Sequence, residues 1–346
     1  MKKPFFIILI FILSCFLFVF CYGINGFAAE TTENSICITD SSGRTVRVKI
    51  PVKRLVILTS DALEIIRSLN AIELVVGVNS GTGQDPLFWP RLKDLPKVGD
   101  WNGPNYELIA GLNPDLVIGY AGRPGPEMEK KLNPFGITVL RLDFYKIKTL
   151  AQEVKILGRI LKKEKEAKEF ACWYQQKMRL IRDRINKLDK LPYVYIESYT
   201  DYHSAGPGSG ADEMCACAGG HNISSGFAIP YPEVTPEWVV AKNPDIIVKA
   251  ASLGRCYEMT EPDKLKNIRT GIIKRPAWNN ISAVKNGKVY VLANDIWTGP
   301  MAIVGISYMA KCFHPALFED VDPVLIHKEY LEKFQKIKYS GIYLYP

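Results

Sequence analysis

The chain lacks the residue patterns that mark common enzyme classes. Its 346 residues include only four histidines and no Gly-x-Ser-x-Gly segment, so no serine nucleophile is placed on a sharp strand-to-helix turn. The glycine-rich segment 206–210 is similar to a phosphate-binding loop, but no lysine follows it. Since no nucleophile, base and orienting acid form a recognisable pattern, we expect a protein that is not an enzyme and has no catalytic residues.

Strong charge bias and low complexity are also missing. The formal net charge is +8, and no run of basic residues with interleaved aromatics occurs, which argues against nucleic-acid binding. Hydrophobic residues make up 47% of the chain, which is enough to bury two cores. The composition therefore indicates a folded protein of two domains.

Cysteines are few and match no strong metal-binding spacing. Six of the eight lie beyond residue 29, an even number that permits disulfides without specifying them. Cys215, Cys217 and His221 are close in sequence, and soft ligands of this kind can hold a transition metal. On a helix, cysteines two positions apart point away from each other and would not bridge. We expect no metal and no cofactor, with a bare-metal or redox site at these three residues as an alternative.

The N-terminus has the layout of an export signal. Lys2 and Lys3 precede an apolar stretch over residues 5–22, and small residues follow to Ala29. Residues 1–29 are therefore expected to be a signal peptide or, because about 20 apolar residues span a bilayer, a membrane anchor. Lipid attachment at Cys15 is poorly supported, because apolar sequence continues beyond it. Either way, the working part of the chain is expected outside the cytoplasm.

One pattern occurs twice, once in each half of the chain. In segments 107–118 and 237–248, a glutamate is followed at a fixed distance by Asn-Pro-Asp and an apolar run rich in β-branched residues. Asn105 and Thr235 are good N-caps for a helix, and the proline ends it. The apolar run suits a strand that is covered on both faces. Each copy therefore predicts helix, sharp stop and buried strand, and the duplication predicts two similar lobes.

The predicted fold class is α/β, with two similar lobes that have parallel central sheets and are joined by one long helix. Helical spacing of apolar residues from about Glu164 to Leu188 predicts that helix, whose length at about 1.5 Å per residue is roughly 37 Å. Residues 36–50 are expected to form a hairpin. The expected parts are an N-terminal lobe over 36–146, a helical connector over 147–190, a C-terminal lobe over 191–335 and a tail over 336–346.

These residues resemble a known family. The chain is similar to the substrate-binding proteins of ABC importers for iron chelates and cobalamin, the periplasmic binding proteins whose lobes are joined by a helical backbone. The likeness covers 36–334 and depends on the order of several motifs: Asp40-Ser-Ser-Gly-Arg44, Val98-Gly-Asp-Trp-Asn-Gly103, the two Asn-Pro-Asp strands, Ala218-Gly-Gly-His-Asn-Ile223 and Arg275-Pro-Ala-Trp278. The resemblance implies a monomeric receptor that meets the membrane through its anchor or by docking on an ABC permease dimer with a cytoplasmic ATPase.

The resemblance also implies roles for two glutamates. In this family one glutamate on each lobe docks into arginine pockets of the permease, and Glu107 and Glu237 match those positions. Charge pairing of this kind sets orientation and encounter rate more than affinity. The alternative is that both are ordinary first-turn glutamates, which the helix dipole favours by a few tenths of a kcal/mol.

The ligand is expected between the lobes, at the ends of the strands. Trp101, His203 and Trp297 match aromatic cleft positions of the family's cobalamin binders, and Tyr120 and Arg123 follow the first Asn-Pro-Asp strand. The expected ligand-binding residues are therefore Trp101, Tyr120, Arg123, His203 and Trp297. The alternative is that the tryptophans only cap the lobe cores.

The sequence does not choose one ligand. Aromatic rings suit a flat corrinoid or heme, whereas Arg123 and Arg255 suit an anionic siderophore. We rank an iron chelate, either a siderophore or heme, first because that group is the broader one in the family, and a corrinoid second.

Overall fold

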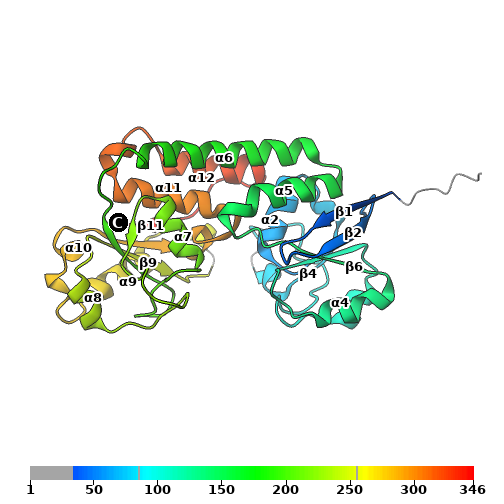
Figure 1. Ribbon diagram of the computed structural model, residues 1–346, viewed down its shortest axis with the longest axis horizontal. Helices are drawn as coiled ribbons and strands as arrows, with labels where there is room; N and C mark the ends of the chain where they lie inside the picture. The colour runs from blue at the N-terminus through cyan, green and yellow to red at the C-terminus, as the bar shows by residue number, and fades with distance from the viewer. Residues whose placement is uncertain (1–33, 85, 255) are drawn as a thin grey trace, which may run out of the picture.

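The computed structural model describes residues 34–84, 86–254 and 256–346. The expected leader, residues 1–29, and Arg255 lie outside the described residues. Two lobes lie side by side beneath one long helix, α6 (Glu164–Ile185), which runs across both (Figure 1). No helix in the part of the chain that is described is both long and apolar enough to cross a bilayer.

The first lobe is built on a four-stranded sheet in which every strand pair is parallel, with strand order β4-β3-β5-β6. An antiparallel hairpin of β1 and β2 precedes this sheet, as predicted for residues 36–50. The elements are β1 (Ser35–Thr39), β2 (Thr45–Lys49), β3 (Leu55–Ile57), α2 (Ser60–Ser68), β4 (Val75–Val78), α3 (Tyr106–Gly111), β5 (Leu116–Gly119), α4 (Glu127–Leu132) and β6 (Thr138–Arg141). Helix α5 (Ile147–Leu161) then leads into α6.

The second lobe has a five-stranded sheet of order β11-β10-β9-β7-β8, parallel except for β11. Its elements are β7 (Tyr193–Glu197), α7 (Gly210–Cys217), β8 (His221–Asn222), α8 (Pro236–Lys242), β9 (Ile246–Ala251), α9 (Asp263–Ile273), α10 (Ser282–Lys285), β10 (Val289–Ala293), α11 (Ala302–Phe313), α12 (Pro323–Glu329) and β11 (Leu344–Tyr345). The predicted α/β class with two parallel-sheeted lobes is confirmed.

The repeated Asn-Pro-Asp segment does more than end a helix. Asn113 and Asn243 adopt left-handed backbone conformations, with φ of 45° and 44°. The Asp115 carboxylate then accepts hydrogen bonds from the backbone N–H groups of Lys53 and Arg54, at 2.7 and 2.9 Å. In the second lobe Asp245 accepts from the N–H of Tyr193 at 2.9 Å. The aspartate therefore fixes the start of the neighbouring strand in both lobes.

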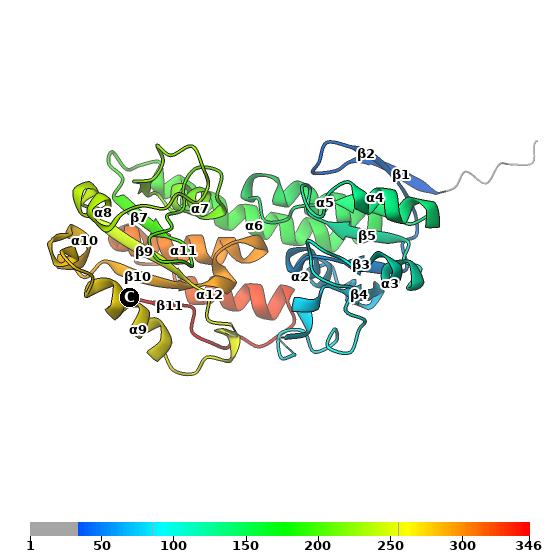
Figure 2. The ribbon, with the colours of Figure 1, turned by 90° about the horizontal axis from the view of Figure 1, so that it is seen from below.

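One apolar core is common to the two lobes. Alternate residues of β3 face opposite sides of the sheet, so Leu55 and Ile57 join this shared core while Val56 packs in a smaller core with Ile109. Strands β7 and β9 divide in the same way. Buried side chains of α5, α6 and α11 complete the shared core. The inner face of each sheet is thus sealed by the same layer of helices (Figures 1 and 2).

A second connection between the lobes follows α12. Sequence reasoning assigned residues up to 335 to the C-terminal lobe, but Tyr330 and Gln335 pack on α2 of the first lobe. The Tyr330 hydroxyl donates to the Glu64 carboxyl, and the Gln335 side chain donates to Ser68 Oγ at 2.7 Å and accepts from Arg67 Nε at 2.7 Å. The predicted tail then returns to the second lobe, where β11 pairs with β10.

The junction at Glu64 predicts a pH-dependent stability. Burial raises the pKa of Glu64 to about 8, against the opposing effect of the Tyr330 hydrogen bond. A raised pKa contributes stability that is complete below the unfolded value, about 4.5, and is lost as the pH rises through 8. Relative to Glu64→Gln, the wild-type free energy of unfolding should therefore fall by up to about 1.4 kcal/mol per pH unit across this window. Urea unfolding at pH 5, 6.5 and 8 measures the difference, and parallel curves for the two proteins would contradict it.

Candidate functional site

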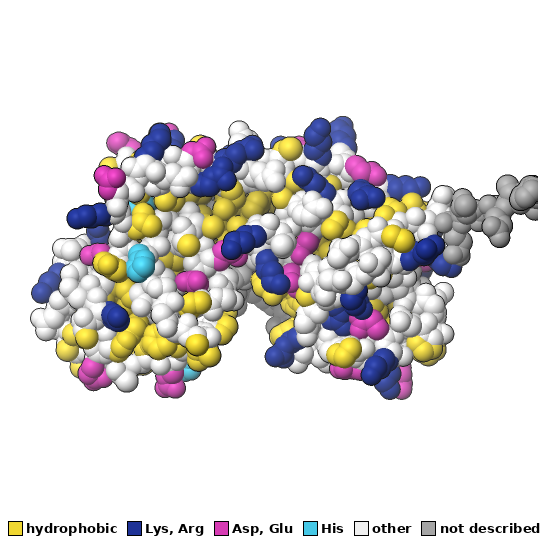
Figure 3. All heavy atoms as spheres, viewed as in Figure 1, with side chains coloured by type: hydrophobic (Ala, Val, Ile, Leu, Met, Phe, Trp, Pro, Cys, Tyr) yellow, Lys and Arg dark blue, Asp and Glu magenta, His cyan; other side chains and the backbone are white. Residues whose placement is uncertain are grey.

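The two lobes face each other across a notch in the surface (Figure 3). A cavity of 210 Å³ lies there, and residues from both lobes line it. Ser60, Asp61 and Glu64 follow β3 of the first lobe, whereas Asn294 and Thr298 follow β10 of the second. The carboxyl ends of parallel strands therefore meet at this place, which is where open α/β sheets bind their ligands.

An aromatic cluster of the first lobe adjoins this cavity through Asp61, which lines the cavity and accepts a hydrogen bond from Tyr120. The rings of Trp101 and Tyr120 meet edge to face with centroids 5.9 Å apart, and Tyr120 meets Tyr145 in the same way at 5.4 Å. The Arg123 guanidinium lies 5.9 Å from the Trp101 ring centre. Trp101 is 42% exposed, which is unusual for so large an apolar ring. Three of the predicted ligand residues are thus brought together, and Tyr145 is an addition.

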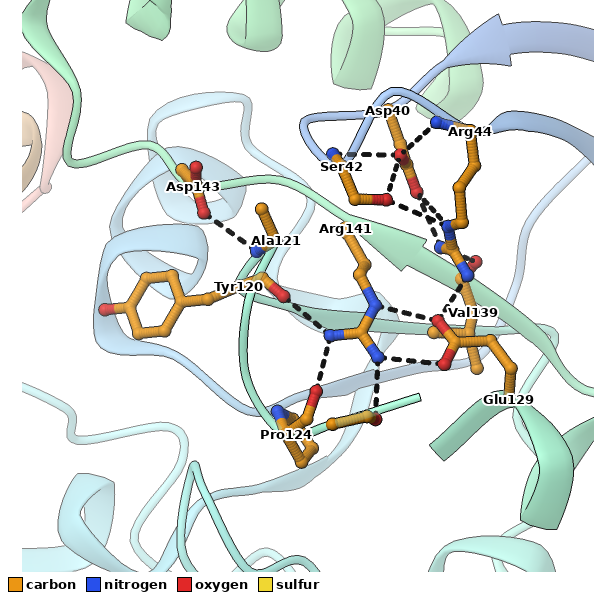
Figure 4. A network of polar contacts seen from close by, with 11 residues as sticks. Asp40, Ser42, Arg44, Tyr120, Ala121, Pro124, Glu129, Val139, Arg141 and Asp143 are labelled. Atoms are coloured by element: carbon orange, nitrogen blue, oxygen red, sulfur yellow. Dashed lines mark hydrogen bonds and ion pairs between the residues drawn. The ribbon is translucent and has the colours of Figure 1, made fainter. Parts of the chain in front are cut away.

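A buried arginine holds the loop that carries Tyr120 and Arg123. The Arg141 guanidinium donates to the carbonyl oxygens of Tyr120, Pro124 and Gly125, at 2.9, 2.7 and 3.0 Å (Figure 4). Its other two donors go to the carboxylate of Glu129. All five N–H donors of the side chain are therefore used, and three of them fix the backbone of the cleft loop.

Asp61 links this cluster to the second lobe. The Tyr120 hydroxyl donates to Asp61 Oδ2 at 2.6 Å. Burial raises the pKa of Asp61 to about 6, although the Tyr120 hydrogen bond opposes the shift. Gly299 has a φ of +76°, and a Cβ at this position would collide with the Asp61 carboxylate. The absence of a side chain at Gly299 thus allows the second lobe to approach Asp61.

Two exposed tyrosines of the second lobe were not predicted from the sequence. Tyr199 and Tyr231 are 48% and 53% exposed, and Tyr199 lies near Asp295, which lines the cavity. Burial of its hydroxyl, with Tyr231 and Asp295 nearby, raises the pKa of Tyr199 to about 12. Tyr199 is the second residue after β7, whereas Tyr120 is the first residue after β5. Tyr120 was selected because it follows an Asn-Pro-Asp strand. Extending the selection to the first four residues after every strand would have added Tyr199 and also Tyr145 after β6.

A buried ion-pair network supports the loop after β7. The Arg275 guanidinium donates to both carboxylate oxygens of Glu197, at 2.7 and 2.9 Å. Lys249 Nζ lies 2.9 Å from Glu197 and also donates to the carbonyl oxygen of Tyr199 at 3.2 Å. The buried Lys249 therefore holds the backbone of Tyr199, as Arg141 holds the backbone of Tyr120 in the first lobe.

The two remaining predicted ligand residues lie elsewhere. Trp297 is only 3% exposed and packs in the shared core. His203 is partly buried in the loop after β7, where its Nδ1 lies 3.2 Å from the carbonyl oxygen of Asp201. Neither side chain joins the cluster around Trp101. Their ligand contacts stay predictions.

The predicted docking glutamates are both solvent-exposed. Glu107 is in the first turn of α3, whose N-cap Asn105 accepts from the N–H of Leu108, and Glu237 is in the first turn of α8, capped by Thr235. Neither carboxylate forms an ion pair with another described residue. The two helices lie on different lobes, far apart along the length of the molecule (Figure 2).

The alternative metal site does not assemble. Cys215 is buried in the core, Cys217 is only partly buried, and the exposed His221 ring packs edge to face on Tyr193 at 5.1 Å. Burial raises the pKa of Cys217 to about 11 and that of Cys215 further still, so neither is a ready thiolate. Among the residues that are described, no group of three or more His, Cys, Asp or Glu side chains could hold a metal ion.

Comparison with known sequences decides the family. The profile of the periplasmic binding protein family matches residues 55–296, which is more than half of the chain. This protein belongs to the periplasmic binding protein family. The match covers most of both lobes, the connecting helices α5 and α6, and the predicted cleft positions 101, 120, 123 and 203, and it stops one residue before Trp297.

Curated relatives of this periplasmic binding protein are substrate-binding proteins. It is 26% identical to the ABC transporter substrate-binding lipoprotein YvrC of Bacillus subtilis, over 84% of this chain and 89% of that protein. It is 24% identical to the molybdate-binding protein MolA of Haemophilus influenzae, over 88% and 92%. A vitamin B12-binding protein of Vibrio vulnificus is 27% identical over 78% and 92%. The chain is thus a binding protein of an ABC importer.

Solved structures agree on the fold. The TroA-like periplasmic binding protein FepB of Veillonella parvula superposes with a TM-score of 0.78 at 25% identity. The superposition covers 90% of this chain and 99% of that chain. A periplasmic heme-binding protein of Pseudomonas aeruginosa gives a TM-score of 0.61 at 25% identity, with coverages of 77% and 94%. The named ligands of the relatives differ, so the fold does not specify the ligand.

The Tyr120–Asp61 pair predicts a pH-dependent effect of mutation. Above pH 6 the folded protein holds Asp61 as a carboxylate, which needs the hydroxyl donor more than the neutral acid does. Tyr120→Phe should therefore lower the free energy of unfolding by about 1–3 kcal/mol at pH 8 and by less at pH 5. Denaturant titrations at the two pH values measure the loss. In an Asp61→Asn background the pH difference should disappear, and its persistence would assign the effect to another group.

Proposed function

We propose that this periplasmic binding protein captures an iron chelate, either a siderophore or heme, between its lobes and delivers it to an ABC permease dimer. The observation that supports this most is that both lobes carry aromatic side chains near the notch, of which Trp101, Tyr199 and Tyr231 are solvent-exposed. Trp101 with Tyr120 and Arg123 lies on the first lobe, and Tyr199 and Tyr231 lie on the second. Aromatic faces bind flat or ring-bearing chelates, and the arginine suits an anionic group.

A corrinoid is the second candidate ligand. Several relatives are named vitamin B12-binding proteins, with identities up to 27%. A corrinoid presents two broad faces, and exposed rings on opposite lobes would cover both. His203 and Trp297 are proposed as further ligand residues on the family resemblance alone.

The proposed location is outside the cytoplasm. Relatives include proteins named as periplasmic binding proteins and one named as a lipoprotein. Residues 5–22 would deliver the chain there and could hold it at the membrane, where the permease with its cytoplasmic ATPase would receive it.

A ligand screen tests the proposed substrate. A ligand at about 100 times its Kd should stabilise the protein by about 2.7 kcal/mol, which thermal unfolding detects readily. The screen compares heme, a ferric hydroxamate, cyanocobalamin, molybdate and bare divalent metals. A shift with heme or the hydroxamate supports the proposal, a shift with cyanocobalamin alone selects the second candidate, and a shift with molybdate or bare metal alone contradicts both.

Mutation of the aromatic cluster tests the site. Trp101→Ala and Tyr199→Ala should each weaken binding of the ligand found in the screen by about tenfold or more, because stacking contributes on the order of 1 kcal/mol beyond buried area. Trp238→Ala is the matched control, since Trp238 lies on α8, packs at a tilt against Phe227 and does not line the cavity between the lobes. Titration calorimetry measures the three dissociation constants, and equal losses in all three proteins would remove the proposed site.

Docking through Glu107 and Glu237 is a separate test. The double variant Glu107→Ala with Glu237→Ala should keep the ligand dissociation constant of the wild type but lose most uptake, since only the charge pairing with the permease is removed. Glu73→Ala with Glu319→Ala removes two other exposed carboxylates as a control. Uptake of labelled ligand by cells that express each variant is the measurement, and normal uptake by the first double variant would reject docking through these residues.

A further inference from the structure

The hairpin turn Asp40–Arg44 lies against the loops that form the first-lobe side of the notch. The turn belongs to neither sheet, yet the N–H of Ser41 donates to the carbonyl oxygen of Arg141 at 2.8 Å. Its side chains reach the same loops by two routes. One goes through Glu129 and the other through Glu153.

The turn itself is held rigidly by a buried carboxylate. Asp40 Oδ1 accepts from the N–H of Ser42 at 3.0 Å, from Ser42 Oγ at 2.7 Å and from the N–H of Arg44 at 3.1 Å. Burial alone would raise the pKa of Asp40, but hydrogen bonds from Arg44 and Ser42 outweigh it and hold that pKa below the usual range. The turn is therefore preorganised before it touches the cleft loops.

The first route is a chain of alternating charges, from Asp40 through Arg44 and Glu129 to Arg141 (Figure 4). Both arginines donate to Glu129 Oε1. Arg44 thereby orients Glu129, and Glu129 orients the guanidinium that holds the carbonyl oxygens of Tyr120, Pro124 and Gly125. Loss of Arg44 would leave Arg141 with a less fixed partner.

The second route reaches the loop that carries Tyr145. Ser41 Oγ donates to Glu153 Oε1 at 2.6 Å, and Glu153 Oε2 accepts from the N–H of Phe144 at 2.6 Å. Phe144 has a φ of 52°, a left-handed conformation that a bulky residue adopts only when its surroundings impose it. Next to it, Asp143 accepts from the N–H of Ala121 at 2.8 Å, which ties the two loops together.

We propose that the Asp40–Arg44 turn positions the ligand site. The turn keeps the loops that carry Tyr120 and Tyr145 in the conformation that binds the ligand. This inference rests on the proposed function, since it takes the notch as the ligand site. None of the turn's residues lines the cavity between the lobes. The turn acts through Glu129 and Glu153.

Variants of the turn test the proposal. Arg44→Met removes the first route, and Ser41→Ala removes the second. Arg47→Met is the matched control: Arg47 is an exposed arginine on the same hairpin, and its side chain forms no hydrogen bond with another described residue. Loss of a charge-assisted hydrogen bond is expected to weaken binding of heme, cyanocobalamin or the ferric hydroxamate about tenfold in Arg44→Met. Arg44→Lys should recover only part of this, because an ammonium lacks the forked geometry.

Hydrogen exchange gives a readout that does not need a ligand. In Arg44→Met the peptide 118–128 should exchange about tenfold faster, and in Ser41→Ala the peptide 140–148 should do so, while the second-lobe peptide 198–204 keeps its wild-type rate. Unchanged exchange in both first-lobe peptides, or an equal rise in all three, overturns the proposal. If the wild-type protein binds none of the three probes, the proposed function fails, and the exchange rates alone still decide whether the turn positions the loops.

Discussion

Both sheets bury one face against the same layer of helices, and the rest of the molecule depends on this constraint. Leu55 and Ile57 of the first lobe and Val194 and Ile196 of the second belong to one core, which α6 and α11 complete. Because the shared core fixes the two sheets relative to each other, the carboxyl ends of their strands face one notch. The return of the chain from α12 to α2 adds a polar connection to this apolar one.

Loops at the carboxyl ends of parallel strands have backbone carbonyls that no neighbouring strand satisfies. In each lobe a buried cation meets this need: Arg141 binds the carbonyl oxygen of Tyr120, and Lys249 binds that of Tyr199. A carboxylate pairs with each cation, the partly buried Glu129 in one lobe and the buried Glu197 in the other. Leaving either charge unpaired would be costly, so each network is retained as a whole. The backbone at Tyr120 and at Tyr199 is thus held in place by a buried side chain in each lobe.

Much of the fold could be predicted from local patterns. The duplicated Asn-Pro-Asp segment indicated two lobes, and Asn105 and Thr235 cap their helices as expected. The site was predicted only in part. Trp101, Tyr120 and Arg123 come together because the segments that follow β4 and β5 leave the sheet at the same edge, although β3 separates the two strands. Tyr199 and Tyr145 were missed because they follow strands without the Asn-Pro-Asp segment, and Trp297 proved to be buried.

The sequence by itself determined where α3 and α8 begin, because N-caps act within a few residues, and it placed the long helix, although α6 ends at Ile185 and not at the expected Leu188. It also determined the family, through motifs whose order is specific. Tertiary structure alone decided what joins distant segments. Nothing in the sequence around Glu129 indicates that its carboxylate joins Arg44 to Arg141. The contact of Tyr330 with Glu64 spans 266 positions. Such contacts depend on how the sheets and helices pack, so no short stretch of sequence encodes them.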